Sequence, residues 1–227
     1  MASTITLQSV VDWARTFTKL IPIVGVGGFS NEPALSICNN VIQEILAPPF
    51  NWKWNRVELA TFLTVDDTQD YSQTVADVGW VESCEREDNA STSTPKPIYE
   101  VEVVQDLPRE FLQGKPEKIC KLKETSTTAT FRVWPMSDTT IWKLYVTYQA
   151  KPPIKTTLGT TTWTPIPDEL GYVIRQGFLA MALAHADDQR ASQEYTKFQR
   201  MIQKALGNAD AEIGHEGFFP DAPLMRG

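Results

Sequence analysis

The chain has 227 residues, of which 42% are hydrophobic and 22% are charged, and its net charge is -7 at pH 7. A chain of this length and composition can bury a substantial core, which excludes an intrinsically disordered protein. The negative charge argues against nucleic-acid binding through neutralisation of phosphates over the whole surface.

The cysteines and the apolar runs exclude further classes. Cys38, Cys84 and Cys120 form no C-x-x-C pair, so neither a disulfide framework nor a zinc knuckle is expected, and the thiols are expected to be reduced. No apolar run approaches the roughly 20 residues that span a bilayer, and the N-terminus lacks the basic region of a signal peptide. We therefore expect no membrane partner.

Two helices are predicted in the first 50 residues. Apolar residues recur at helical spacing over residues 6–21 and again from Asn31 to Leu46. Pro48 and Pro49 end the second pattern, because a proline removes a backbone donor and clashes with the preceding turn.

The next hundred or so residues have the period of β-strands. Six short runs are rich in β-branched and aromatic residues and are separated by turn residues. Pro135 to Asp138 separates the last two runs as a turn, which predicts a hairpin. The predicted strands are Leu59–Val65, Val78–Cys84, Ile98–Val104, Ile119–Leu122, Thr128–Trp134 and Ile141–Tyr148.

Two further amphipathic helices follow, between Thr164 and Gly207. Pro167 and Asp168 suit a first helical turn, and Gly207 with Asn208 is predicted to end the second of these helices. Gly177 lies on the apolar face of the first, where glycine costs on the order of 1 kcal/mol relative to alanine. It therefore indicates close approach of another backbone, either within the core or from a neighbouring subunit.

The order of these elements predicts an α+β fold. Two N-terminal and two C-terminal helices are expected to form a four-helix bundle (1–56 and 164–208), because each pair alone leaves an apolar face exposed. The bundle would carry an inserted antiparallel β-sandwich or barrel-like domain (57–163). Residues 209–227 are expected to form an extended C-terminal tail. Its anchors, which either pack on the parent domain or bind a partner, are Phe218, Phe219, Leu224 and Met225.

The charges are grouped by sign within the β block. Between Glu58 and Asp88 there are nine acidic residues and one base, Arg86, whereas four lysines crowd Lys115 to Lys123. Such runs are typical of solvated faces, and opposite-sign blocks can also mate between copies of one chain.

The residues of known catalytic and cofactor motifs are missing. His185 and His215 belong to no such motif, and the glycines of residues 25–28 lack the lysine and hydroxyl of a phosphate loop. We therefore expect no catalytic, cofactor-binding or metal-binding residues, no cofactor and no enzymatic activity.

Several short segments resemble head-to-tail adaptor proteins of tailed bacteriophages, also called connector or neck proteins. After two helices come Pro49-Phe50-Asn51-Trp52-Lys53-Trp54-Asn55-Arg56, then Phe62 to Val65 and Asp70-Tyr71. Tyr148 with Pro152-Pro153, Ile166 to Leu170, and an alanine-rich helix before Tyr195 and Phe198 complete the resemblance. It covers most of residues 1–208.

The resemblance implies a structural protein of the virion that assembles in the host cytoplasm as a ring, expected to hold twelve copies, in the neck beneath the portal. It implies helical units side by side around the ring, a C-terminal segment that embraces the portal, and a β part that faces the next tail, nozzle or fibre protein. DNA would pass through the lumen without specific binding, and an acidic wall would repel its phosphates. Gly177 would be a subunit contact, and the partner-binding residues would be those of the tail.

Two alternatives stay open from the sequence. A tail completion or terminator protein would form its ring at the tube instead of under the portal. A carbohydrate-binding β module with helical supports would use tryptophans as stacking platforms, for which the candidates are Trp80, Trp134, Trp142 and Trp163.

Overall fold

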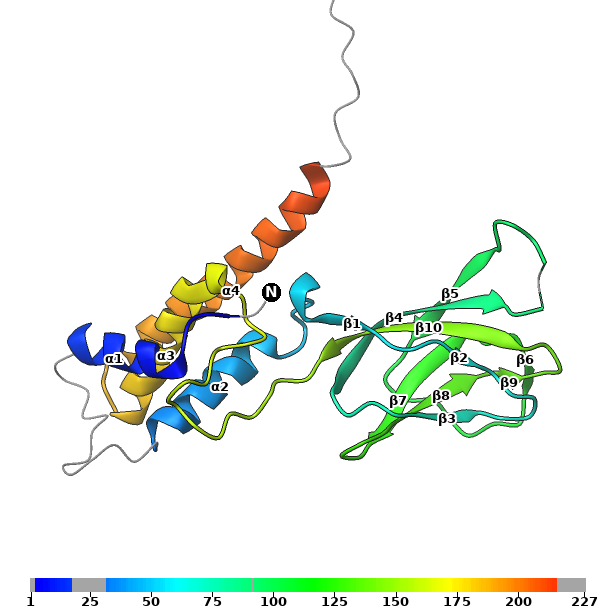
Figure 1. Ribbon diagram of the computed structural model, residues 1–227, viewed down its shortest axis with the longest axis horizontal. Helices are drawn as coiled ribbons and strands as arrows, with labels where there is room; N and C mark the ends of the chain where they lie inside the picture. The colour runs from blue at the N-terminus through cyan, green and yellow to red at the C-terminus, as the bar shows by residue number, and fades with distance from the viewer. Residues whose placement is uncertain (1–2, 18–31, 91, 216–227) are drawn as a thin grey trace, which may run out of the picture. The chain divides into compact units, whose positions relative to one another are not determined.

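The computed structural model describes residues 3–17, 32–90 and 92–215. The chain forms two compact units, one from Met1–Trp54 with Pro152–Gly227 and the other from Asn55–Lys151. We call them the helical unit and the β unit (Figure 1). From the sequence, the boundaries between the helical and β domains were predicted at 56/57 and 163/164.

The helical unit is organised around α3. This helix packs against each of the other three helices, whereas α1 and α2 contact each other at only a few residues. Short 3-10 turns occupy Lys53–Asn55 and Asp168–Leu170. The α-helices are α1 (Leu7–Phe17), α2 (Ala34–Leu46), α3 (Gly171–His185) and α4 (Ala191–His215).

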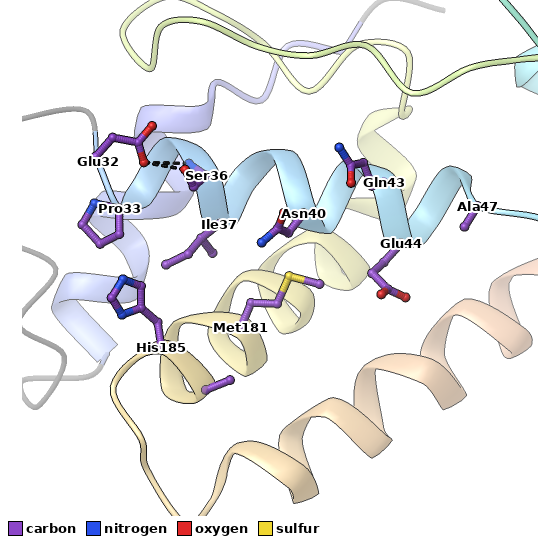
Figure 2. Close-up of a pocket in the computed structure, with 11 residues that line it drawn as sticks. Glu32, Pro33, Ser36, Ile37, Asn40, Gln43, Glu44, Ala47, Met181 and His185 are labelled. Carbon is purple, nitrogen blue, oxygen red and sulfur yellow. Dashed lines mark hydrogen bonds between the residues drawn. The ribbon is translucent and has the colours of Figure 1, made fainter.

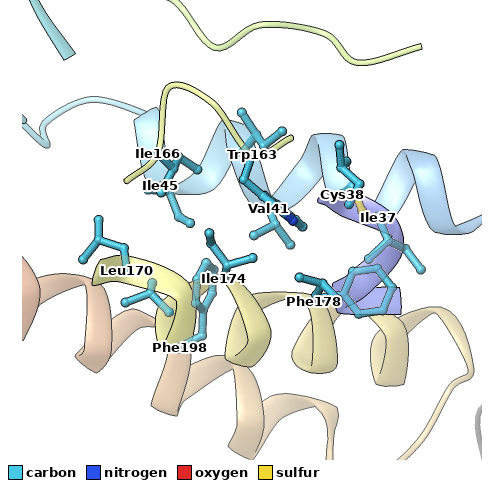
Figure 3. Packing of buried hydrophobic residues seen from close by; sticks show 14 of the residues in the cluster. Ile37, Cys38, Val41, Ile45, Trp163, Ile166, Leu170, Ile174, Phe178 and Phe198 are labelled. Atoms are coloured by element: carbon cyan, nitrogen blue, oxygen red, sulfur yellow. The ribbon is translucent and has the colours of Figure 1, made fainter. Parts of the chain in front are cut away.

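The predicted four-helix bundle is wrong. A bundle needs helices of similar length around one shared core, but α1 has 11 residues and α4 has 25. Non-helical residues also complete this core: Leu158, Trp163 and Ile166 are buried with the helices. Figure 3 shows Trp163 and Ile166 on the α2 side of the cluster and Phe178 on α3.

At Gly177 two other helices approach α3 closely. It is buried on α3, and a Cβ atom added there would lie 2.6 Å from Cε2 of Phe198 on α4 and 3.0 Å from Cγ1 of Val41 on α2. Both distances are too short for an ordinary side chain. The missing side chain therefore lets the Phe198 ring pack on the α3 backbone.

Asp168 ties the N-terminal segment to the start of α3. Its carboxylate accepts hydrogen bonds from the hydroxyl of Ser3 at 2.7 Å, the backbone N–H of Thr4 at 2.9 Å and that of Ile5 at 3.2 Å. The hydroxyl of Thr4 also donates to it. These donors stabilise the charged carboxylate and lower the pKa of Asp168 from 3.8 to about 2.

The β unit contains one curled eight-stranded sheet and one two-stranded sheet (Figure 1). The large sheet has the order β1-β10-β4-β5-β7-β8-β3, with β2 also paired to β10, and β6 pairs with β9. The strands are β1 (Arg56–Glu58), β2 (Phe62–Leu63), β3 (Asp70–Gln73), β4 (Val78–Asp88), β5 (Ile98–Val103), β6 (Gln113–Gly114), β7 (Lys118–Glu124), β8 (Ala129–Trp134), β9 (Met136–Ser137) and β10 (Trp142–Ala150).

The predicted antiparallel sandwich or barrel is also wrong. The eight-stranded sheet is a curled half-barrel, and it is mixed because β5 and β7 are parallel. The two strands of the small sheet, β6 and β9, are also parallel. The predicted hairpin between the last two strands does not form. β8 pairs with β7 and β3, and the residues taken as its turn include β9, which pairs with β6 instead.

Residues 62–73 pair with two different strands of the curled sheet. The first part of this segment pairs with β10 as β2, and its last part pairs with β8 as β3. Between them the backbone N–H of Thr64 donates to the carbonyl of Trp142 at 2.8 Å. Inside the curl the ring of Phe62 lies 5.4 Å from that of Tyr71 and 6.3 Å from that of Phe131.

The last helix is longer than the sequence indicated. Gly207 was predicted to end it, but α4 continues to His215, so residues 209–215 of the predicted extended tail are helical. Gly207 is exposed and nothing lies within 4 Å of a Cβ added to it. Glycine there weakens the helix without ending it, because no left-handed turn follows.

Substitution of Gly177 and of Gly207 by alanine should have opposite effects on stability. Gly177→Ala should lower the free energy of unfolding by about 1–3 kcal/mol, because the new methyl group overpacks the Phe198 ring. Gly207→Ala, its matched control, should raise that free energy by up to about 1 kcal/mol, because alanine favours helix and the site is open. Urea unfolding monitored by circular dichroism measures both. Equal effects of the two substitutions would contradict the close packing at Gly177.

The Asp168 cluster predicts a pH-dependent contribution to stability. A carboxyl with a lowered folded-state pKa stabilises the fold above its unfolded pKa, and this contribution is lost as the pH falls through the folded pKa. Asp168→Asn should therefore lower the melting temperature at pH 7, and the difference from the wild type should shrink between pH about 4 and about 2. Thermal unfolding of both proteins tests this, with the exposed neighbour Glu169→Gln as the control. A difference that stays constant down to pH 2 would contradict it.

Candidate assembly surfaces

A groove of about 810 Å³ runs along one face of α2 and the C-terminal half of α3. Its α2 residues recur every three or four positions, which places them on one helical face. In Figure 2, Met181 of α3 lies across from Asn40, and His185 lies across from Pro33. The groove is lined by Glu32, Pro33, Ser36, Ile37, Asn40, Gln43, Glu44, Ala47, Met181, Ala184 and His185.

The lining of the groove is mixed: two carboxylates lie among polar side chains and beside apolar ones from Pro33, Ile37, Ala47, Met181 and Ala184. Glu32 accepts hydrogen bonds from the hydroxyl of Ser36 at 2.6 Å and from its backbone N–H at 3.3 Å. Glu44 accepts one from the side-chain amide of Gln199 on α4 at 3.3 Å. His185 is exposed at the end of α3. A groove with this lining suits an occupant that offers both cationic groups and apolar carbon chains, as lysine and arginine side chains do.

A cluster of exposed apolar side chains lies on the β unit. Three segments far apart in sequence are tied together there: Gln113 donates to Asp67 at 3.0 Å, and the N–H of Met136 donates to the carbonyl of Leu112 at 3.0 Å. Phe111 is the most exposed member, at 88%. We call this set the apolar corner, and it consists of Leu63, Val65, Phe111, Leu112 and Ile141.

Exposed apolar groups gathered in this way mark interaction surfaces. The apolar corner was not predicted from the sequence, although Phe111-Leu112 is an apolar pair between the polar residues Glu110 and Gln113. The groove was not predicted either, although Ser36, Asn40 and Glu44 give α2 a polar stripe at helical spacing.

Charged residues from both the acidic and the basic block form salt bridges within the β unit. Asp70 pairs with Arg132 at 2.7 Å, and Lys118 pairs with Glu102 at 3.2 Å. The Asp70–Arg132 pair lowers the pKa of this carboxyl below its ordinary value through the hydrogen bond from the guanidinium. Lys115 stays exposed. Mating of these blocks between copies remains a prediction.

Two predictions about interacting residues concern the chain end and Gly177. Phe218, Phe219, Leu224 and Met225 lie outside the described residues. Gly177 is enclosed by Val41 and Phe198 of its own chain, which accounts for the glycine without a second subunit. Its proposed role as a subunit contact stays a prediction.

Two of the four tryptophans of the carbohydrate-binding alternative are buried. Trp163 has no exposed surface and belongs to the core of the helical unit, and Trp142 is 5% exposed. Neither can present a ring face to a sugar. Trp134 is half-buried, and the ammonium of Lys118 lies 5.9 Å from its ring centroid.

The described residues contain neither a metal-ligand cluster nor a membrane-spanning helix. Over residues 3–17, 32–90 and 92–215, no three His, Cys, Asp or Glu side chains are grouped as metal ligands would be. In the same ranges, every helix is too short or too polar to cross a bilayer.

A helical unit and a curled β unit, each with an exposed surface suited to another molecule, are typical of a protein that assembles with others. The sequence model of the SU10 adaptor protein family matches residues 7–216, and the chain belongs to this family. It is a bacteriophage adaptor protein, which confirms the resemblance noted in the sequence. A search of curated proteins found no match to the chain.

The contrast between two phenylalanines tests the apolar corner. Phe111→Ala should change the free energy of unfolding by less than about 0.5 kcal/mol, because the ring makes little contact with its own chain. Phe131→Ala, the matched control inside the curl, should cost about 3–5 kcal/mol. Phe111→Ala should also reduce binding of a hydrophobic dye. A large loss of stability in this variant would show that Phe111 is part of the core.

Proposed function

We propose that the chain is a structural protein of the virion neck that forms a ring of about twelve copies between the portal and the tail, and has no catalytic activity. The observation that carries this proposal is the family match over residues 7–216, which spans both units. The acidic groove and the apolar corner support it, because each offers a surface for a further protein.

In such a ring, different parts of the chain would bind different partners. The β unit carries the apolar corner, which we assign to the next tail, nozzle or fibre protein. The chain end that follows α4 contains Phe218, Phe219, Leu224 and Met225, which we assign to the portal. These residues follow α4 in the sequence, and α4 itself continues to His215.

DNA passage through the ring agrees with the charge of the chain. A net charge of -7 disfavours tight binding of phosphates, so DNA can slide past. DNA in transit would therefore need no specific site.

Removal of the chain end tests the portal contact. A chain truncated after His215 should keep the melting curve of the full chain, because both described units remain complete. It should lose at least tenfold in affinity for purified portal, because the proposed anchors are gone. Co-sedimentation with portal measures this, and the double substitution Phe218→Ser with Phe219→Ser is the milder variant. Undiminished binding by both variants would contradict the assignment, and failure of the full chain to bind portal would contradict the adaptor role.

A further inference from the structure

A basic face runs along α4. Lys197, Arg200 and Lys204 are exposed and stand three and four positions apart, so their side chains project from the same side of the helix. Phe198, Ile202 and Ala205 are buried on the other side, in the core with α3. We call the three exposed cations the basic face.

The charges of the basic face are poorly balanced by the chain itself. Lys197 pairs with Glu194 at 2.7 Å, but in the described part of the chain neither Arg200 nor Lys204 has a salt bridge. Like charges three and four positions apart destabilise an isolated helix. A gathering of cations in a chain of net charge -7 indicates that an acidic partner lies against it.

The groove on α2 has the complementary charge. Glu44 has no cationic partner among the residues that the structure describes. Its neighbours on α4 are neutral: the side-chain amide of Gln199 donates to it at 3.3 Å, and the hydroxyl of Tyr195 lies beside it. Glu32 adds a second carboxylate at the other end of the groove (Figure 2). The α2 face from Glu32 to Glu44 is about 18 Å long and the basic face about 10 Å, so one can lie within the other.

The two surfaces cannot meet within one chain. Gln199, on the side of α4 next to Glu44, is the immediate neighbour of Arg200, and successive residues of a helix point in widely different directions. The basic face is therefore turned away from the groove of its own chain. When one surface of a copy binds the complementary surface of the next copy, the contact is head-to-tail. Repetition of this contact closes into a ring when the rotation between neighbouring copies allows it.

We propose that the acidic groove along α2 binds the basic face of α4 from a second copy of this chain. This inference rests on the proposed ring and names the residues that build it. Glu44 lies against Arg200 and Lys204 of the neighbouring copy, and the amides of Asn40 and Gln43 offer hydrogen bonds beside them. The neighbour's basic face neutralises the groove, and its own groove receives the next copy.

Charge reversal tests the contact. Glu44→Lys alone, and Arg200→Glu with Lys204→Glu in another chain, should each lose the ring mass in light scattering under conditions where the wild type assembles with portal. An equimolar mixture of the two variants should recover it, because every contact in an alternating ring then joins opposite charges. Lys53→Glu reverses an exposed charge elsewhere and should assemble normally. Circular dichroism of each variant verifies that it is folded.

The outcomes separate this contact from the adaptor role. Rings formed by both charge-reversed variants alone would overturn the groove contact and leave the adaptor role intact. The same result with loss of duplex-DNA retention by the Arg200→Glu, Lys204→Glu chain would assign the basic face to DNA. Folded variants that fail to assemble even when mixed would also overturn it. A wild-type chain that never assembles would overturn the ring, and this contact with it.

Discussion

The close packing at Gly177 is the constraint on which the helical unit depends. α3 can pack against three helices because its backbone is bare where Phe198 crosses it and where Val41 of α2 approaches. This contact sets the distance between α3 and α4, and with it the position of everything that α4 carries. The buried ring of Phe198 fixes which side of α4 faces inward, so Arg200 and Lys204 face outward. The basic face is therefore a consequence of core packing.

Much of the helical unit could be predicted from the sequence, because the spacing of apolar residues follows the helix period. The buried residues of α2, from Leu35 to Leu46, are those that the pattern selects. The end of α4 was missed because Gly207 and Asn208 permit a helix stop but do not force one. The arrangement of the helices was missed because Trp163 and Ile166, outside any helix, take part of the core that a bundle would fill.

Less of the β unit could be predicted from the sequence. The alternation of residues in Phe131 to Trp134 and after Ile141 identifies strands, but pairing depends on contacts distant in sequence. Segment 62–73 contacts both β10 and β8, and no local signal in Phe62 or Asp70 reports that. The surfaces could not be predicted for the same reason, since the segments that contain Phe111 and Val65 are joined only in the folded chain, through the hydrogen bond from Gln113 to Asp67. What the sequence did supply for function was the family resemblance, which the family match confirms.

The central claim is that the chain forms a ring between portal and tail, and electron cryo-microscopy of the neck in intact particles tests it most directly. We predict a ring of repeated densities directly beneath the portal, each containing a helical unit built on α3 and a separate curled β unit. Adjacent helical units should meet with α4 of one copy against α2 of the next. Density for the chain at the tail tube, or a ring beneath the portal built from another protein, would contradict the account.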